Sequence, residues 1–579
     1  MNKNTEKIVL RTVSLMLVLV VVCWLRWAVV KGQIEQQLMV LLPCFLFWNF
    51  CLILLAVWLN RRVLAQKYSD IPGEIKKWLA AVILVGVFVT SLVAPRTHRI
   101  FYDEDIYLNI AQNIVYEGKA AMANEAYNEY GEYHLGSSFY NKEPIGFPFL
   151  VSLIFRVFGV QELYAHLLNN FLLGLAVLVV FWIAAQIFED HWAGIYAALI
   201  YALMPQNLLW ANTTSVEISS ALFAVLPVLA AVLYVKSRDP KLLFLMVSLA
   251  AFGCQFRPES GLILCICFLI IAIFSFRETR KTYFWWMMAV LVFLLVPHLV
   301  HLSHVKDLDW GSSSAKFSIG YFLPNLKVNG LFYFNNKEFP LIYTFLAAAG
   351  FVVGKNVRWK GILLLWFILF WGIFLFFYAG SYNYGADDRF SLLSHAPLAL
   401  FAGYGLREIF KKEFFQKYLC QDGEIMKKLG LLVILLAFCQ FLPFVRALTQ
   451  EAWAARADHR YARMFLKDIP PHSIVLSHDP AMFLLWGQSA GQLSTAKDAP
   501  AHVYNDLFSV YPGGVYAHLG YWCNSPDKTQ NPFCEYVRDH YDTTLIKQYL
   551  DGGFSFELLK IHNDKDSKDY SPLKEGSKR

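Results

Sequence analysis

Apolar runs long enough to cross a lipid bilayer recur along this chain of 579 residues, and they constrain its fold more than any other feature. A helix needs about 20 apolar residues to span a hydrocarbon core about 30 Å thick. The runs therefore predict an all-α polytopic membrane protein. We expect about 13 transmembrane helices, at residues 8–30, 37–59, 78–94, 162–188, 192–210, 217–235, 242–256, 261–276, 283–301, 340–354, 361–378, 391–406 and 429–446.

Composition agrees with a membrane protein and excludes several other classes. Hydrophobic residues make up 57% of the chain and charged residues 16%, whereas soluble domains average about 45–50% and about 25%. Disordered chains, coiled coils and small disulfide scaffolds are thereby excluded. The net charge of +7 comes without a basic domain or stripe, so no nucleic-acid partner is expected.

Positive charge predicts the orientation, because short cytoplasmic loops of membrane proteins are rich in Lys and Arg. Lys3, Lys7 and Arg11 precede the first span, which we interpret as a retained anchor in the cytoplasmic (inner) membrane with the N-terminus inside. The long loops 95–143 and 302–339, and everything after about 447, then fall outside. The basic short loops fall inside, at 60–77, 236–241, 277–281, 355–360 and 407–428.

Two segments do not fit as spans. Residues 145–158 are too short and contain Pro148 and Arg156, so we expect an interfacial helix on the outer face. The tail from 447 to 579 contains the strand-like run SIVLS at 473–477 and a turn signal at 512–514, which predict a small extracytoplasmic α/β domain. The charged stretch from Asn563 onward is expected to be a frayed end.

Most of the ten cysteines lie in apolar spans, where they are expected to be small buried hydrophobes. Cys523 and Cys534 stand apart in a polar loop of the predicted outer domain. Outside the cytoplasm a disulfide between them is expected. Zinc is the weaker interpretation, since two sulfurs make only half of a tetrahedral site.

The first long outer loop carries the most chemistry. In residues 101–119, isoleucines repeat every four residues with Asn109, Gln112 and Asn113 opposite, which predicts a short amphipathic helix suited to the membrane surface. Asp103, Glu104 and Asp105 begin it. These acids could cap the helix. Alternatively, one of them could be a general base for an acceptor hydroxyl, or the first and third could hold a divalent metal.

Further charged residues fall at the predicted outer ends of spans. Singly, each has a simple structural explanation, such as a helix-dipole partner, an internal ion pair or a snorkelling side chain. Together they would suit a lipid phosphate clamped by cations beside a carboxylate base. They are Lys142, Glu143, Glu217, Arg257, Glu259, Asp388 and Arg389.

Three histidines near the end of span 283–301, His298, His301 and His304, are spaced closely enough on a helix for a metal site, although histidines at an interface more often face water or headgroups. The sequence has no P-loop, dinucleotide fingerprint or G-x-S-x-G elbow at a position where such a motif would function.

In its motifs the chain resembles the C-type glycosyltransferases (GT-C), in particular the branch with the protein O-mannosyltransferases and the lipid A aminoarabinose transferase. The acid motif of the first loop is Asp103-Glu104, with Tyr107 and Ala111 in register. Lys142-Glu143-Pro144 opens the interfacial helix, and Glu217 opens a later span. The remaining similar elements are Phe256-Arg257-Pro258-Glu259 and Arg389-Phe390, followed by Pro397 and the run from Ala402 to Leu406.

The resemblance implies a GT-C-like catalytic module at 78–446, with its outer loop at 95–161, preceded by two additional helices at 1–77. It implies an inverting transfer of one sugar from a polyprenyl-phosphate donor to a protein, glycolipid or polysaccharide acceptor. Asp103 would be the base with Glu104 in support, and no metal or other cofactor is expected. Lys142, Arg257 and Arg389 would hold the donor phosphate; Asp105, Tyr107, Glu217, Glu259 and Asp388 are further site candidates.

Two other functions compete with sugar transfer. A transporter or lipid flippase would be expected to show internal repeats and ionisable groups near the bilayer midplane. The ionisable residues instead gather at the predicted outer ends of the spans. A non-catalytic membrane scaffold with an outer binding domain is the third interpretation.

Overall fold

The structure is a computed structural model that describes residues 34–305, 315–354, 356–383, 386–411, 423–448, 452–524 and 532–563. The predicted span at 8–30, residues 412–422 of the basic loop at 407–428 and the charged end beyond Asn563 lie outside these residues. The chain divides into two compact units. Unit 1 comprises Met1–Thr97, Lys142–Phe149 and Ala165–Thr449; unit 2 comprises His98–Asn141, Leu150–Tyr164 and Gln450–Arg579.

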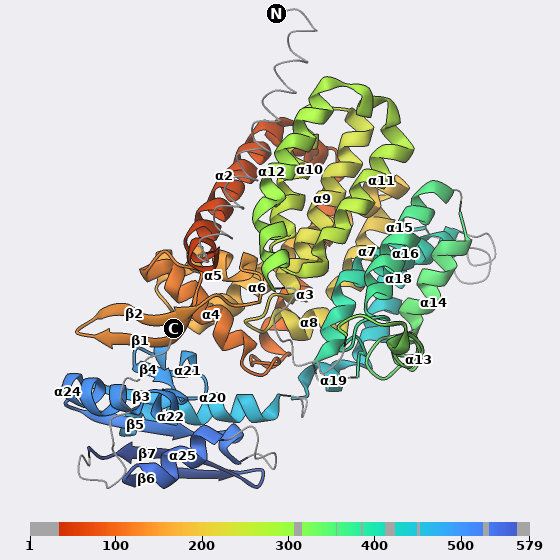
Figure 1. Cartoon of the computed structure of the whole chain (residues 1–579). Helices are drawn as coiled ribbons and strands as arrows, with labels where there is room; N and C mark the ends of the chain where they lie inside the picture. Colours follow the sequence, from red (N-terminus) through yellow and green to blue (C-terminus); the bar gives the residue numbers. More distant parts are fainter. Residues whose placement is uncertain are drawn as a thin grey trace, which may run out of the picture. The chain divides into compact units, whose positions relative to one another are not determined.

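Unit 1 is built from helices (Figure 1). Six described helices are long and apolar enough to cross a membrane: α2 (Ile34–Ser69), α3 (Gly73–Leu92), α6 (Glu162–Phe188), α9 (Glu217–Ser237), the segment Pro258–Arg280 that contains α11 (Ile263–Ser275), and α12 (Thr282–Val305). The others are α7 (His191–Ala202), α8 (Pro205–Ala211), α10 (Pro240–Gly253), α13 (Phe322–Phe332), α14 (Leu341–Val352), α15 (Val357–Ile373), α16 (Leu392–Lys411), α18 (Gly423–Cys439) and α19 (Leu442–Arg446).

Each helix of this second group falls short of either the length or the apolar character of a full crossing, so the predicted total of about 13 spans stays a prediction. The predicted span at 192–210 shows why, because it is two helices. Pro205 is the first residue of α8, and a proline disfavours helical backbone in the residue before it. The side chain of Asn207 donates a hydrogen bond of 2.8 Å to the carbonyl of Tyr201, near the end of α7.

Helix α9 lies at the centre of unit 1. Every residue from Glu217 to Val235 is buried except Leu226. It packs against α10, α11 and α16. A helix that is apolar on all sides can be stable only when other helices or lipid surround it. Glu217, in the first turn of α9, is therefore a carboxylate buried in the protein interior.

Unit 2 contains a seven-stranded mixed sheet with the order β2-β1-β4-β3-β5-β7-β6. The parallel pairs are β3 with β4 and β3 with β5; the remaining neighbours are antiparallel. The predicted strand at 473–477 is β3. The strands are β1 (Met122–Glu129), β2 (Glu132–Phe139), β3 (Ser473–Ser477), β4 (Ser489–Gln492), β5 (Gly514–Leu519), β6 (Thr543–Asp551) and β7 (Phe554–Ile561).

Two apolar cores cover the sheet. One contains Ala462 and Phe465 of α20 (Trp453–Phe465) with Tyr102, and the other contains Val537 of α25 (Pro532–His540). Cys523 and Cys534 belong to the second core and form a disulfide. Short helical segments complete the unit: α21 (Ala481–Leu484), α22 (Thr495–Asp498), α23 (Pro500–His502) and α24 (Phe508–Val510).

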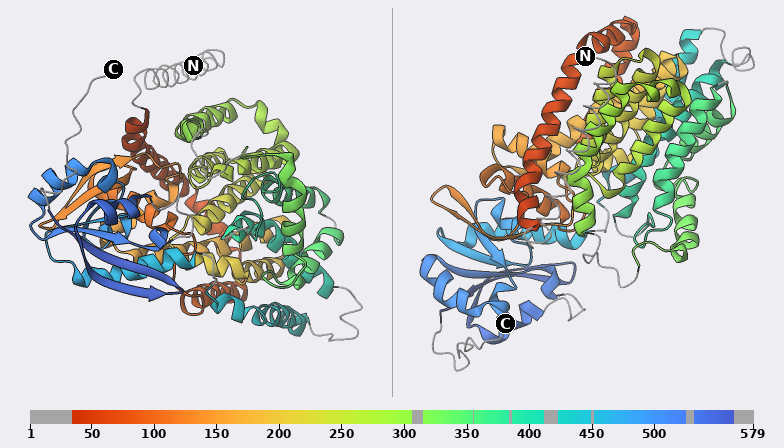
Figure 2. Two further views of the ribbon diagram at one scale, coloured as in Figure 1. Left: turned by 60° about the horizontal axis from the view of Figure 1, so that its bottom comes forward. Right: turned by 45° about the horizontal axis from the view of Figure 1, so that its top comes forward.

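The first long loop takes part in this sheet, which the sequence analysis does not anticipate. Strands β1 and β2 form a hairpin whose turn places Tyr130 and Gly131 at positive φ, and β1 then pairs with β4 of the tail (Figure 2). Glu125 lies opposite Gly491 in this pairing. Residues 98–141 and the tail are therefore one compact unit.

Helix α4 (Asp103–Tyr116) lies within the segment predicted to be helical, but its polar face is not exposed. Asn109, Gln112 and Asn113 are all buried. The amides of Gln112 and Asn113 donate to the carbonyls of Leu484 and Ala121, and Asn109 accepts from the backbone of Ala123. The polar face of this predicted amphipathic helix thus binds the backbone of its own unit. Helix α5 (Gly146–Phe158) is the apolar helix predicted at 145–158.

Candidate functional site

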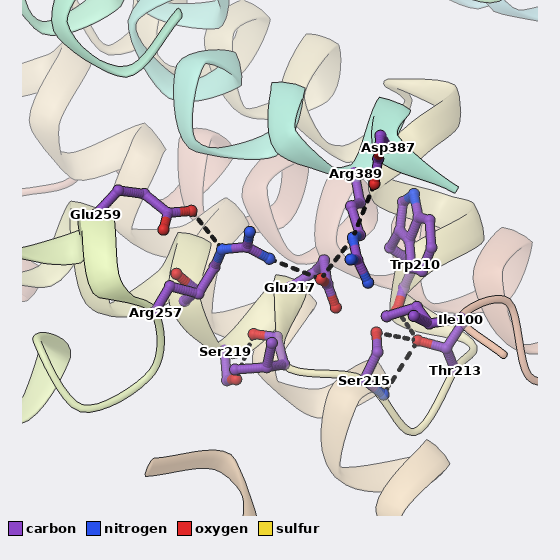
Figure 3. A network of polar contacts seen from close by, with 12 residues as sticks. Ile100, Trp210, Thr213, Ser215, Glu217, Ser219, Arg257, Glu259, Asp387 and Arg389 are labelled. Carbon is purple, nitrogen blue, oxygen red and sulfur yellow. Dashed lines mark hydrogen bonds and ion pairs between the residues drawn. The ribbon is translucent and has the colours of Figure 1, made fainter. Parts of the chain in front are cut away.

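Two arginines of unit 1 meet at the carboxylate of Glu217, and each of them also faces a second acid (Figure 3). Nη1 of Arg257 lies 2.8 Å from Oε1 of Glu217, and Nε of Arg257 lies 2.5 Å from Oε1 of Glu259. Nε of Arg389 lies 3.7 Å from the same Glu217 oxygen and 3.8 Å from Asp387. The side chain of Glu217 is 1% exposed, so it is a buried carboxylate shared by two guanidinium groups.

The position of Glu217 is set by the polar turn before α9. The side-chain amide of Asn169 in α6 donates to the carbonyls of Thr213 and Ser215, over 2.9 and 2.8 Å. The hydroxyl of Thr213 in turn donates to the carbonyl of Trp210. A buried turn must satisfy its backbone groups with such partners. This network holds the start of α9 in place.

The two arginines reach Glu217 from separate segments. Arg257 has extended backbone because Pro258 follows it and begins the short helix η1 (Pro258–Leu262). Arg389 lies in η4 (Asp387–Ser391), just before α16. The ring of Phe390 lies 4.9 Å from Cζ of Arg257 and 5.2 Å from Cζ of Arg389, so both guanidinium groups also contact an aromatic ring.

The segment that carries Lys142 and Glu143 is joined to the segment that carries Arg257. The backbone N–H of Gly146, at the start of α5, donates a hydrogen bond of 2.7 Å to the carbonyl of Gln255. A Cβ atom at position 146 would lie 2.5 Å from that oxygen. Only glycine permits this approach, so the sequence fixes how closely these two segments pack.

The acids of the first loop lie in unit 2, at the start of α4. Asp103 is half-buried, whereas Glu104 and Asp105 are buried. Glu104 accepts hydrogen bonds from the backbone N–H groups of Arg99 and Ile100, over 2.5 and 3.1 Å. It therefore fixes the segment that leads into the helix. Tyr107 is buried one turn further along.

Asp105 lies between two histidines. Its oxygens are 3.5 Å from Nδ1 of His98 and 3.0 Å from Nδ1 of His459 in α20. Burial alone would raise the pKa of Asp105, but the positive charges of His459 and His98 hold that pKa at about 2. Burial lowers the pKa of His459, and the Asp105 carboxylate outweighs it and raises that pKa to about 9.

A second buried carboxylate lies next to this group. Asp458 accepts a hydrogen bond of 2.6 Å from the hydroxyl of Tyr102 and one of 2.8 Å from the backbone of Tyr521. Burial raises the pKa of Asp458 to about 7, against these hydrogen bonds. Tyr102 directly precedes Asp103, so Asp458 fixes the residue next to the candidate base.

Each unit thus contains part of the predicted site. Unit 2 contains Asp103, Glu104, Asp105 and Tyr107, and unit 1 contains Lys142, Glu217, Arg257, Glu259, Asp388 and Arg389. Sequence reasoning singled out Asp388, and the structure adds its neighbour Asp387, which lies 3.8 Å from Nε of Arg389. The run of two aspartates before Arg389 was the available signal.

The histidines that the sequence singled out do not form a metal site in the described residues. His298 and His301 are buried in α12, and His304 pairs with Glu35 over 3.0 Å. Within unit 2 the described His, Cys, Asp and Glu side chains do converge at His98, Asp105 and His459. The sequence analysis missed both of these histidines, because nothing in a sequence relates residues so far apart.

Comparison with known proteins places these motifs in a family context. Residues 142–301 match the family model described as dolichyl-phosphate-mannose-protein mannosyltransferase. This segment includes Lys142, Glu217, Arg257 and Glu259. Among curated proteins, no sequence matches the chain.

Solved structures share the fold at low sequence identity. ArnT from Cupriavidus metallidurans in the apo state is 11% identical, with a TM-score of 0.52 over 84% of this chain and 98% of that one. ArnT from the same organism bound to undecaprenyl phosphate is 14% identical, with a TM-score of 0.51 over the same shares. The chain therefore shares the fold of ArnT, in agreement with the resemblance in its motifs.

Proposed function

We propose that the chain is an integral membrane glycosyltransferase that transfers one sugar from a polyprenyl-phosphate donor to an acceptor on the outer face of the cytoplasmic membrane. The observation that carries the proposal is the pair Arg257 and Arg389, which converge on the buried Glu217. Arg257 and Glu217 lie inside the segment that matches the mannosyltransferase family model. A lipid-linked donor agrees with the undecaprenyl phosphate bound to ArnT.

The chemistry of the donor explains why two arginines are needed. As the bond between the sugar and the phosphate breaks, negative charge grows on the leaving phosphate oxygen. Fixed guanidinium groups stabilise that charge without reorganising. Glu217 and Phe390 hold both groups in position, so little side-chain entropy is lost when the phosphate binds. We assign Lys142, Arg257 and Arg389 to the donor phosphate, with Glu259 and Asp388 as supporting groups.

The acceptor requires a base. In the proposed single displacement, Asp103 accepts the proton of the acceptor hydroxyl while the oxygen of that hydroxyl attacks the anomeric carbon of the donor sugar. The bond between the sugar and the phosphate breaks, and the lipid phosphate leaves with its electron pair. The anomeric configuration is inverted. Glu104 supports Asp103 by holding the preceding segment. A protein, a glycolipid or a polysaccharide could each supply the hydroxyl.

The test separates the two roles. Asp103→Asn keeps the size of the side chain but removes the base, so we expect sugar transfer to fall by roughly 10²–10⁴-fold, while the purified chain still binds undecaprenyl phosphate. Arg257→Ala and Arg389→Ala should each weaken that binding by about tenfold to 100-fold, because a charge-assisted hydrogen bond is lost. Asp498→Asn, at an exposed aspartate of unit 2, is the control and should change neither quantity.

Two outcomes would contradict the assignment. Near-normal transfer by Asp103→Asn would remove Asp103 as the base. Unchanged binding of undecaprenyl phosphate in both arginine variants would show that the phosphate binds elsewhere, and the proposed function would lose the observation that carries it.

A further inference from the structure

Two histidines face the buried carboxylate of Asp105. Nδ1 of His98 and Nδ1 of His459 both face Asp105, at 3.5 and 3.0 Å from its two oxygens. Ligands that lie 2.0–2.1 Å from a tetrahedral zinc ion are separated by about 3.3 Å. Each histidine is therefore near ligand spacing from one oxygen of Asp105, and one ligand atom from each of His98, Asp105 and His459 lies within 4.8 Å of the others.

Hydrogen bonds do not account for this arrangement. Both oxygens of Asp105 and Nδ1 of His459 are buried. Within the described residues, none of these three atoms has a hydrogen bond of acceptable geometry. Asp105 is 1% exposed. Asp105 instead faces the two imidazoles at ion-pair distance, and a cation shared by the three side chains would satisfy its buried oxygens.

The outer edges of both imidazole rings face a second carboxylate. Nε2 of His98 lies 3.1 Å from Oε1 of Glu162, and Nε2 of His459 lies 3.5 Å from its Oε2. Histidines that bind zinc through one ring nitrogen usually donate the other N–H to a carboxylate, which fixes the ring. Glu162 is in the position for that role, on the side of the rings away from Asp105.

We propose that His98, Asp105 and His459 bind a zinc ion in unit 2, with Glu162 supporting the two imidazoles. Three protein ligands leave one position of a tetrahedral ion for water. The ion would join the segment before α4, α4 itself and α20, and so fix the helix that begins at Asp103. The test of the site measures bound metal and does not require activity.

The test measures metal in the full chain purified without chelators. We expect about one zinc per chain by elemental mass spectrometry, and visible d–d absorption bands when Co²⁺ is added to the chelator-treated chain. His459→Gln and Asp105→Asn should lose both signals. Glu162→Gln should keep the site and bind zinc roughly 10- to 100-fold more weakly. His502→Gln should bind normally; this histidine also pairs with two carboxylates, Glu125 and Asp506, but elsewhere in unit 2.

The wild-type measurements decide the question even if a variant fails to fold. A wild-type chain without zinc that also gives no Co²⁺ bands would overturn the proposal, and protonated histidines would then be the counter-charges of Asp105. Undiminished zinc in a folded His459→Gln chain would overturn it as well.

Discussion

At the scale of single residues, Glu217 determines the geometry of the proposed donor site. It is buried, and both Arg257 and Arg389 approach the same oxygen atom. Glu259 contacts only one of these arginines, Arg257. Two acids of similar chemistry therefore differ in how many guanidinium groups depend on them.

This difference predicts how two matched variants behave. Glu217→Gln removes the negative charge that Arg257 and Arg389 share, and both guanidinium groups are largely buried. We expect the free energy of unfolding to fall by roughly 3–5 kcal/mol. Glu259→Gln leaves Arg257 its contact with Glu217 and should cost less. We expect a larger fall in the melting temperature of the detergent-purified protein for Glu217→Gln than for Glu259→Gln. Equal melting temperatures for the two variants would contradict the central role of Glu217.

The same residues show what a sequence can predict about a site. Four candidate site residues stand out in the sequence because each lies beside a span end or in a short motif: Asp103, Glu217, Arg257 and Arg389. The clustering of Glu217 with both arginines depends on the packing of α9, η1 and η4, which a motif does not contain. The histidines around Asp105 come from two segments that only the folded unit 2 brings together.

At the scale of elements, helix α5 depends on glycine at its first residue. The N–H of Gly146 donates to the carbonyl of Gln255, two residues before Arg257, and no side chain fits between them. Gly146→Ala should therefore push the segment with Lys142 away from the segment with Arg257. We expect lower thermal stability and weaker binding of undecaprenyl phosphate.

A helical glycine in open space provides the control. Gly361 lies within α15 and a Cβ atom there would meet nothing within 4 Å. Gly361→Ala should be neutral or raise stability by up to about 1 kcal/mol, because alanine has the higher helix propensity. If both substitutions have the same effect, the close approach at Gly146 is not what holds the two segments together.

Helices were easier to predict than the sheet, for a physical reason. A transmembrane helix satisfies its backbone within one segment, so runs such as 162–188 and 217–235 indicate it directly. The pairing of β1 with β4 is long-range, and no local pattern in 122–129 indicates its partner. Asn109, Gln112 and Asn113 looked like a solvated face, whereas they bind backbone groups that the sequence could not place.

At the scale of the whole molecule, the distribution of basic loops predicts which units face outward. We expect the tail after 447 to lie outside the cytoplasmic membrane. Ser509 is exposed in α24, so Ser509→Cys should react with a membrane-impermeant thiol reagent in intact cells. A cysteine at Arg61, in the loop predicted to be inside, should react only after permeabilisation. The opposite pattern would invert the topology.

The most direct test of the proposed function is the composition of the glycoconjugates made with and without the protein. Mass spectrometry would compare envelope glycans and polyprenyl-phosphate sugars from cells with the wild-type chain, with Asp103→Asn, and without the gene. We predict that one glycoconjugate loses the mass of a single sugar in the last two cases, while the matching polyprenyl-phosphate sugar accumulates. Identical glycans and lipid-linked sugars in all three would contradict the account.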